Sequence, residues 1–176
     1  VESASAPAFC RSAEERIVEK LLKPRHEELG AVLEAMQGKV ELGLKALWTD
    51  MESIFREIAE GNTEVRKLRA SALKDASQQA RMAVGRAVSQ ALLAKKESEK
   101  NQLLLALKPL ADDMRSNKTF GDRMFLNASF LVDRSKVGEF GEAVSVLSEK
   151  LQGKVRLSSV GPVPISNFVE IVITWD

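Results

Sequence analysis

Residue types on which catalytic and metal sites depend are scarce in this sequence. Its one cysteine, Cys10, excludes an internal disulfide and a cysteine-based zinc site, which fits a reducing, cytoplasmic compartment. Its one histidine, His26, excludes a metal site with two histidines, and the surrounding PRHEE favours an exposed helical residue over a catalytic base. The glycines form neither a phosphate-binding loop nor a dinucleotide-binding fingerprint. These absences predict a protein without metal or cofactor and argue against an enzyme.

Long apolar runs and a large net charge are also lacking. No stretch approaches the roughly 18 consecutive apolar residues of a membrane-spanning helix, and no signal sequence opens the chain. The net charge is only +1, so the chain as a whole is not expected to attract nucleic acid or anionic lipid. With 44% hydrophobic and 29% charged residues, the 176-residue chain can bury a core. We therefore expect a soluble, cytoplasmic protein with no small-molecule substrate.

The C-terminal part of the chain carries the clearest secondary-structure pattern. Apolar and polar residues alternate over 124–132, which is the period of a half-buried strand. Over 137–151 the apolar residues instead recur at threes and fours, as on one face of a helix. Two further strands are expected, one beginning at Val155 and one over 168–175. This order of elements predicts a ferredoxin-like α+β domain over residues 101–176.

An N-terminal α+β lobe is expected over residues 11–62. It is preceded by residues 1–10, which show no pattern and are expected to be a disordered lead or a truncation remnant. Within the lobe, two short amphipathic helices separated by Pro24 lead into the segment 38–48, in which apolar and polar residues alternate. That alternation predicts a strand.

A long helical connector is predicted over residues 63–100, which contain no proline. An alanine-rich stripe along it would let the helix pack closely on a partner helix, and the opposite face, from Arg66 to Arg81, is basic. That basic face is interpreted as solvated, with phosphate contact as the alternative. The charged run 95–100 is expected to end the helix, and the stripe over 103–114 predicts a further one.

Several separated segments resemble motifs of the gas vesicle accessory proteins of the GvpL/GvpF family. RMFLNASFLVDR resembles the family's "LNAAFLV-D/E-R" strand, and KVGEFGEAVSVLSEKLQGKVRLSSVGPVPISNFV resembles the "EF" helix and "GPWPPYSFV" turn that follow it. LLKPRHEELGAVLEAMQGKVELGLKALW resembles the family's helix and "G-K/R-VE-[WL]-G-[VL]-K" strand, and RMAVGRAVSQALLAKK resembles its "GR-V--AL--K" helix. The motifs occur in the expected order between Ser12 and Thr174.

This resemblance implies a cytoplasmic gas vesicle accessory or minor structural protein. Such a protein would assist vesicle assembly by binding the main shell protein and other accessory proteins. The resemblance also implies two ferredoxin-like lobes joined by the long helix, the first incomplete, because family members carry further strands before this point. A shell subunit that builds a water-excluding wall is aggregation-prone while free, so a partner with an exposed sheet edge or apolar helix stripe could hold it.

Three surfaces are candidate interfaces on this interpretation. They are the segment 38–48, as an edge strand of the incomplete lobe, the alanine-rich stripe, and the stiff turn 161–168. The candidate residues are Val40, Leu42, Leu44, Trp48, Ala72, Ala76, Ala83, Ala87, Gly161, Pro162, Pro164 and Phe168. In the turn, Val163 replaces the bulky aromatic of the family motif, and a purely structural corner is favoured, with an interface as the alternative.

A ferredoxin-like module that binds nucleic acid or a small ligand, sharing only its shape with the family, is the alternative function. Such domains stack bases on aromatic side chains of the sheet. The sequence contains no tyrosine, and Phe125 is the only aromatic expected on the less apolar face of its strand. This composition disfavours the alternative.

Overall fold

The computed structural model describes residues 13–75 and 77–170, which form two separate units. The first unit comprises the chain up to Gln37 together with the residues from Val169, and the second is Gly38–Phe168. The first unit contains α1 (Ala13–Ile17), η1 (Val18–Leu22) and α2 (His26–Met36). The break at Pro24 agrees with the sequence, because proline lacks the N–H that would continue the helix. His26 is exposed, as expected.

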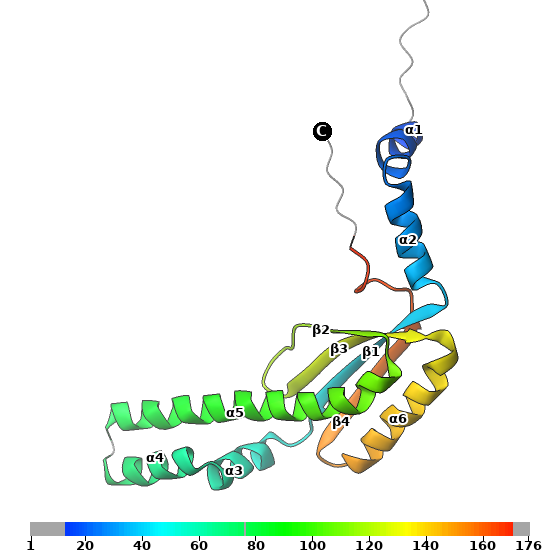
Figure 1. The fold of residues 1–176 in the computed structure, drawn as a ribbon. Coiled ribbons are helices and arrows are strands. Elements are labelled where there is room, and N and C mark those ends of the chain that lie inside the picture. Colours follow the sequence, from blue (N-terminus) through cyan, green and yellow to red (C-terminus); the bar gives the residue numbers. More distant parts are fainter. Residues whose placement is uncertain (1–12, 76, 171–176) are drawn as a thin grey trace, which may run out of the picture. The chain divides into compact units, whose positions relative to one another are not determined.

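The second unit has the ferredoxin-like order of strands and helices. Its elements are β1 (Lys39–Trp48), α3 (Met51–Gly61), α4 (Thr63–Lys74), α5 (Gln78–Leu107), η2 (Lys108–Leu110), β2 (Asp113–Ser116), β3 (Met124–Asp133), η3 (Arg134–Lys136), α6 (Val137–Lys150) and β4 (Val155–Val163). The four strands form one antiparallel sheet in the order β2-β3-β1-β4 (Figure 1). Helices α3 to α5 connect β1 to β2, and α6 connects β3 to β4. The α+β class and the ferredoxin-like topology are confirmed.

Strand β1 lies inside this sheet, so the expected edge position of residues 38–48 is wrong. Leu44 is the register partner of Ala128 in β3 on one side and of Ser159 in β4 on the other. The segments 11–62 and 101–176, which the sequence predicts as separate lobes, therefore both contribute strands to one sheet. Alternation identifies a strand and its faces, but it does not identify partners that are distant along the chain.

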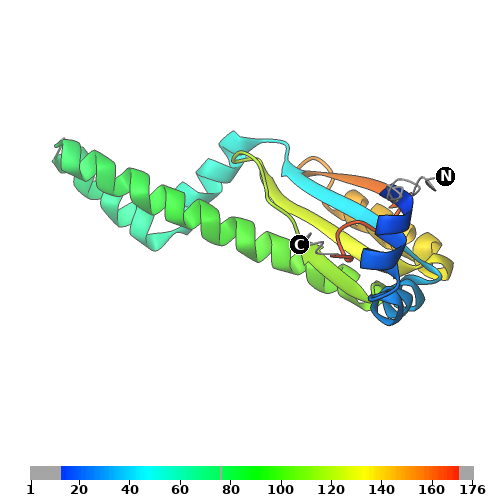
Figure 2. The same ribbon diagram turned by 90° about the horizontal axis from the view of Figure 1, so that it is seen from above.

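The predicted single connector helix is instead a hairpin of two helices. The chain breaks between α4 and α5, where Asp75 accepts a hydrogen bond from the Ser77 backbone N–H at 3.0 Å and Ser77 caps α5 through the Ala80 N–H at 3.2 Å. Asp and Ser compete in this way with a continuous helix. Helix α4 packs beside the first half of α5, and the pair extends beyond the sheet (Figures 1 and 2).

Two other boundaries differ from the sequence prediction. The thirty residues of α5 continue through the charged run 95–100, where Glu97 and Lys100 pair at 2.7 Å along the helix. Met114, expected on a helical stripe, lies in β2, because η2 contains Pro109 and ends the helix before it. The predicted strand 168–175 falls largely outside the described residues, and its described part, 168–170, is not in a strand.

The core lies between one face of the sheet and the helices α5 and α6. Leu44 of β1, Phe130 of β3 and Leu107 of α5 are fully buried there. Phe125 belongs to the same core and stacks on Trp48 with ring centroids 5.0 Å apart, which corrects its expected place on the less apolar face. The register with β1 slips at this point, so Phe125 is the extra residue of a β-bulge and turns inward. Within the described part of the chain, no helix is long and apolar enough to span a bilayer.

Candidate functional site

The predicted interface residues of β1 do not lie on the surface. Val40, Leu42, Leu44 and Trp48 are at most 7% exposed. The last three belong to the core between the sheet and helices α5 and α6. A partner therefore cannot reach these side chains in the folded chain.

The predicted alanine stripe is used largely within the protein. Ala87 is buried in the core, and Ala72 and Ala83 are half-buried on α4 and α5, which pack together. Ala76 lies outside the described residues. The partner helix that the stripe predicted is thus a neighbouring segment of the same chain, because the connector is a hairpin.

The predicted turn is partly exposed and partly packed against β1. Gly161, Pro162 and Pro164 are exposed, whereas Phe168 is buried and the Arg115 guanidinium of β2 lies 5.6 Å from its ring centroid. Gly161 has φ +132, and a Cβ there would lie 2.8 Å from a β1 side chain and 2.9 Å from a β1 carbonyl. Glycine is therefore needed where β4 approaches β1.

A buried carboxylate holds the segment after β4 against the sheet. Glu41 of β1 is 3% exposed and points away from the α5–α6 side of the sheet. One of its oxygens accepts hydrogen bonds from the backbone N–H groups of Ser166 and Asn167, each at 2.9 Å. Its other oxygen accepts a bond from the Asn167 side-chain amide. We call this cluster of Glu41, Ser166 and Asn167 the strap anchor.

The strap anchor favours the ionised form of its carboxyl group. Burial alone would raise the pKa of Glu41, but the hydrogen bonds from Asn167, Ser166 and Ser129 outweigh it and lower that pKa. Ser129 in turn accepts a bond from the Asn117 amide at 3.0 Å. No local signal predicts this site, because an acidic residue in an alternating strand is ordinarily expected to face water.

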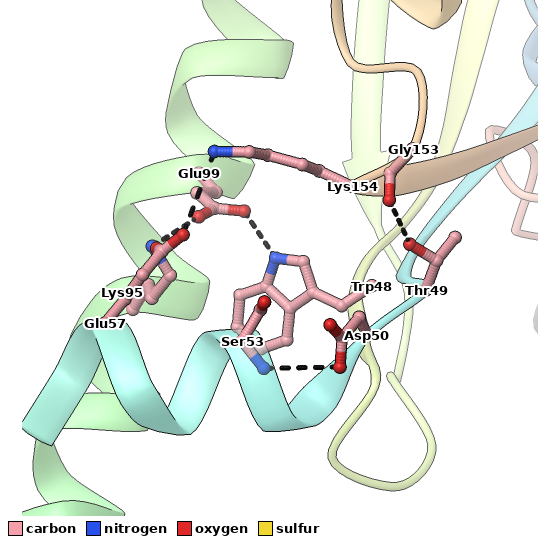
Figure 3. Close-up of polar contacts among 9 residues, drawn as sticks. All are labelled: Trp48, Thr49, Asp50, Ser53, Glu57, Lys95, Glu99, Gly153 and Lys154. Carbon is pink, nitrogen blue, oxygen red and sulfur yellow. Dashed lines mark hydrogen bonds and ion pairs between the residues drawn. The ribbon is translucent and has the colours of Figure 1, made fainter.

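A second polar cluster joins β1 to α3 and α5 (Figure 3). The Trp48 indole N–H donates to Glu99 at 2.5 Å, and the Lys95 ammonium lies 2.9 Å from both Glu99 and Glu57. Burial alone would lower the pKa of Lys95, but its bonds to Glu99 and Glu57 raise it; the bond from Lys95 also lowers the pKa of Glu57. Lys154 lies 3.8 Å from Glu57. These charges neutralise one another around the indole.

A cavity of about 560 Å³ opens beside this cluster, lined by Trp48, Leu103 and Phe125 among others. Its charged side chains are those already paired, which leaves it without an unpaired ionic group for a charged ligand. Nowhere in residues 13–75 and 77–170 do three or more metal-ligating His, Cys, Asp or Glu side chains converge. Cys10 lies outside the described residues.

Strand β4 forms a long exposed edge of the sheet. The Thr49 N–H donates to the Lys154 carbonyl at 3.0 Å, so these two residues form a hydrogen-bonded pair. Along an antiparallel pair of strands, hydrogen-bonded and non-hydrogen-bonded residue pairs alternate. The backbone groups of Arg156, Ser158 and Val160 therefore face β1, and those of Leu157 and Ser159 face outward. Pro162 follows within the same strand. We call residues 157–164 the β4 edge.

The hairpin end formed by α4 and the start of α5 is basic and apolar. Six exposed cations lie on it against two acids between residues 63 and 90: Arg66, Lys67, Arg69, Lys74, Arg81 and Arg86. Leu73 is 88% exposed and Met82 54% exposed. A hollow of about 290 Å³ is lined by Arg69, Ala72, Leu73, Arg81 and Val84. We call residues 66–75 and 77–86 the hairpin tip. This surface was not predicted from the sequence; the signal that could have indicated it is Leu73, which lies off the alanine stripe.

Comparison with known proteins identifies the family. The family model described as "Gas vesicle synthesis protein GvpL/GvpF" matches residues 9–170, which is most of the chain. The chain belongs to the GvpL/GvpF family. This result confirms the resemblance inferred from the sequence motifs, and it identifies a gas vesicle-related protein.

Relatives and solved structures of GvpL/GvpF proteins agree with this. "Gas vesicle protein F" from Dolichospermum flosaquae is 24% identical over 144 residues, covering 81% of this chain and 58% of the relative. The protein of that name from Nostoc sp. PCC 7120 is also 24% identical, with 81% and 59% covered. The crystal structure of the gas vesicle protein GvpF from Anabaena sp. PCC7120 superposes with a TM-score of 0.82 at 23% identity, covering 90% of this chain and 65% of that one.

A second crystal structure, of gas vesicle protein GvpF from Microcystis aeruginosa, superposes with a TM-score of 0.68 at 20% identity. It covers 82% of this chain and 60% of that one. At these identities the superpositions establish the shared fold. The chain spans less than two thirds of the length of each of these relatives and solved structures.

Proposed function

We propose that this GvpL/GvpF protein assists gas vesicle assembly in the cytoplasm by binding the main shell protein and other accessory proteins. The family match over residues 9–170 is the observation that carries the proposal. Its physical basis is that a shell subunit with a large apolar surface aggregates while free, unless a partner covers that surface until the subunit is incorporated.

The β4 edge is the surface we assign to the shell protein. An unpaired edge strand can accept an extended segment of another chain through main-chain hydrogen bonds. Val160 is 54% exposed on this edge and offers apolar contact next to the outward backbone groups of Ser159. Gly161, Pro162 and Pro164, which we keep as candidate interface residues, extend the same edge. Proline also limits how far pairing can continue, since it has no N–H to donate.

Co-expression with the main shell protein tests this proposal. We expect the shell protein to co-purify with this chain and to stay in the soluble fraction. Ser159→Pro removes an outward N–H without a bond to β1, so it should abolish co-purification, whereas Ser159→Ala keeps that N–H and should not. Circular dichroism checks that both variants fold. Absence of co-purification with the wild-type chain, or equal binding by both variants, would contradict the proposal or the assignment of the edge.

Nucleic-acid binding by the sheet is the weaker alternative. The aromatic residues of the four strands, Trp48, Phe125 and Phe130, all lie in the core, so in the described sheet none is presented for base stacking. A gel-shift assay with single-stranded RNA and DNA at low salt should show no shift for the wild-type chain. A salt-sensitive shift would favour the alternative.

A further inference from the structure

The hairpin tip combines three features that the assignment of the β4 edge does not use. Its cations are exposed, and within the described residues the guanidinium groups of Arg69 and Arg81 form no hydrogen bond or ion pair. Leu73 is almost fully exposed on the tip, although a large apolar side chain on a helix is ordinarily turned toward the protein. The hollow of about 290 Å³ lies between the two helices, with the arginines on its wall.

We infer that the hairpin tip binds an acidic amphipathic helix of a protein partner. The hollow can receive an apolar side chain against Leu73, Ala72 and Val84, as in the helix-in-groove mode of recognition. Carboxylates flanking that side chain then meet Arg69 and Arg81, whose planar guanidinium groups bind carboxylates with two parallel bonds. The excess of cations on the tip matches a partner of opposite charge and speeds its encounter.

Other anionic partners fit this surface less well. Residues 63–90 contain no Phe, Trp or Tyr on which bases could stack. A helix that lies on a membrane needs a continuous apolar face, but the polar residues Ser77, Gln78 and Gln79 separate Leu73 from Met82 in the sequence. The concave, partly apolar hollow flanked by arginine is instead suited to one side chain of a folded helix.

The test uses the full chain and two synthetic peptides. The acidic peptide has leucine at helical spacings and glutamate at the flanking positions, and the basic peptide replaces each glutamate with lysine. Fluorescence anisotropy should show salt-sensitive binding of the acidic peptide only. Reversing both charges in Arg69→Glu/Arg81→Glu should weaken this binding by about tenfold or more, since it replaces two attractions with two repulsions. The matched control, Lys150→Glu/Arg156→Glu, reverses two exposed cations elsewhere and should bind as the wild type does.

The apolar contact has its own variant and control. Leu73→Ser should weaken binding of the acidic peptide by about tenfold, because an anchor side chain is lost. Leu105→Ser changes a 71% exposed leucine elsewhere on α5 and should leave binding unchanged. Thermal unfolding followed by circular dichroism verifies that all variants fold, as expected for exposed positions.

Four outcomes would overturn the inference. They are equal binding of both peptides, no effect of the tip variants, displacement of the acidic peptide by single-stranded RNA or by phosphatidylserine vesicles, and tip-dependent self-association of the chain in sedimentation. The inference does not depend on shell-protein binding. Ser159→Pro should bind the acidic peptide like the wild type, so failure at the β4 edge and failure at the tip are distinguishable.

Discussion

Replacing Glu41 should release the segment that follows β4 and lower the free energy of unfolding. The carboxylate accepts two backbone N–H bonds of 2.9 Å from Ser166 and Asn167, and a third bond from the Asn167 amide. Hydrogen bonds to a charged group contribute about 1.5–3 kcal/mol each when buried, but the released N–H groups of exposed residues can bond to water. We therefore expect Glu41→Ala to cost about 2–4 kcal/mol, part of it from the lost burial of Phe168.

Glu41→Gln should cost less, about 1–2 kcal/mol. Its amide oxygen can still accept both backbone N–H groups, but the charge that strengthens these bonds is gone. The difference in the free energy of unfolding between the wild type and Glu41→Gln should depend on pH. Because the pKa of Glu41 is lowered in the folded state, its stabilisation is present above the unfolded-state pKa of about 4.3 and is lost as the pH falls through the lower folded-state pKa.

Urea unfolding followed by circular dichroism measures the free energy, and hydrogen exchange measures local release at Ser166 and Asn167. The matched control is Glu142→Gln, on the exposed face of α6, which should change the free energy of unfolding by less than about 0.5 kcal/mol. If Glu41→Ala unfolds like the control and the two amides exchange no faster than in the wild type, the strap anchor does not hold the segment and the reasoning fails.

Three further changes test the packing around β1 and the hairpin. Gly161→Ala should lower the free energy of unfolding in urea by about 2 kcal/mol or more, because the new Cβ would lie only 2.8 Å from a β1 side chain. The control is Gly43→Ala, whose Cβ would make only an ordinary contact at 3.8 Å. Equal losses for the two variants would contradict the close approach of β4 to β1. Glu99→Ala should lower the free energy of unfolding by about 1–3 kcal/mol, because it leaves the buried indole N–H of Trp48 without an acceptor. The control Glu97→Ala removes an exposed ion pair and should lower it by less than about 0.5 kcal/mol. Ser77→Ala should lower the free energy of unfolding by about 1 kcal/mol, because α5 loses its N-terminal cap. An unchanged urea midpoint would argue against a helix break between α4 and α5.

Local pattern was sufficient to predict most of the elements. The alternation over 124–132 and the helical spacing over 137–151 correspond to β3 and α6. The place of β1 was not predictable in this way, because pairing with β3 and β4 is set by contacts between distant segments. The hairpin break at 75–77 had a local signal, Asp75 followed by Ser77, that the surrounding alanine-rich helical pattern outweighed.

The candidate sites were harder to predict than the elements. An alanine stripe at helical spacing indicates close packing, but it does not say whether the partner is another protein or the other arm of a hairpin. Burial of Glu41 depends on a segment more than a hundred residues away, so the strap anchor has no local signature. Leu73 was likewise missed, although it lies outside the apolar stripe of its own helix.

The positions of the motif residues also indicate where partner contacts should be sought. GKVELG and GPVPISNF, two of the segments that resemble the family, meet in the structure: Glu41 of the first holds Ser166 and Asn167 of the second, and Gly161 packs on β1. These residues serve the fold, because each is needed for one strand to approach another or for a segment to close over the sheet. Contacts with other proteins instead require backbone groups or side chains that remain accessible, and in Gly38–Phe168 these are found at the β4 edge and the hairpin tip. A substitution at Glu41 or Asn167 should therefore affect the stability of the chain first and its binding only as a consequence, whereas a substitution at Leu73 or Ser159→Pro should change binding in a chain that still folds.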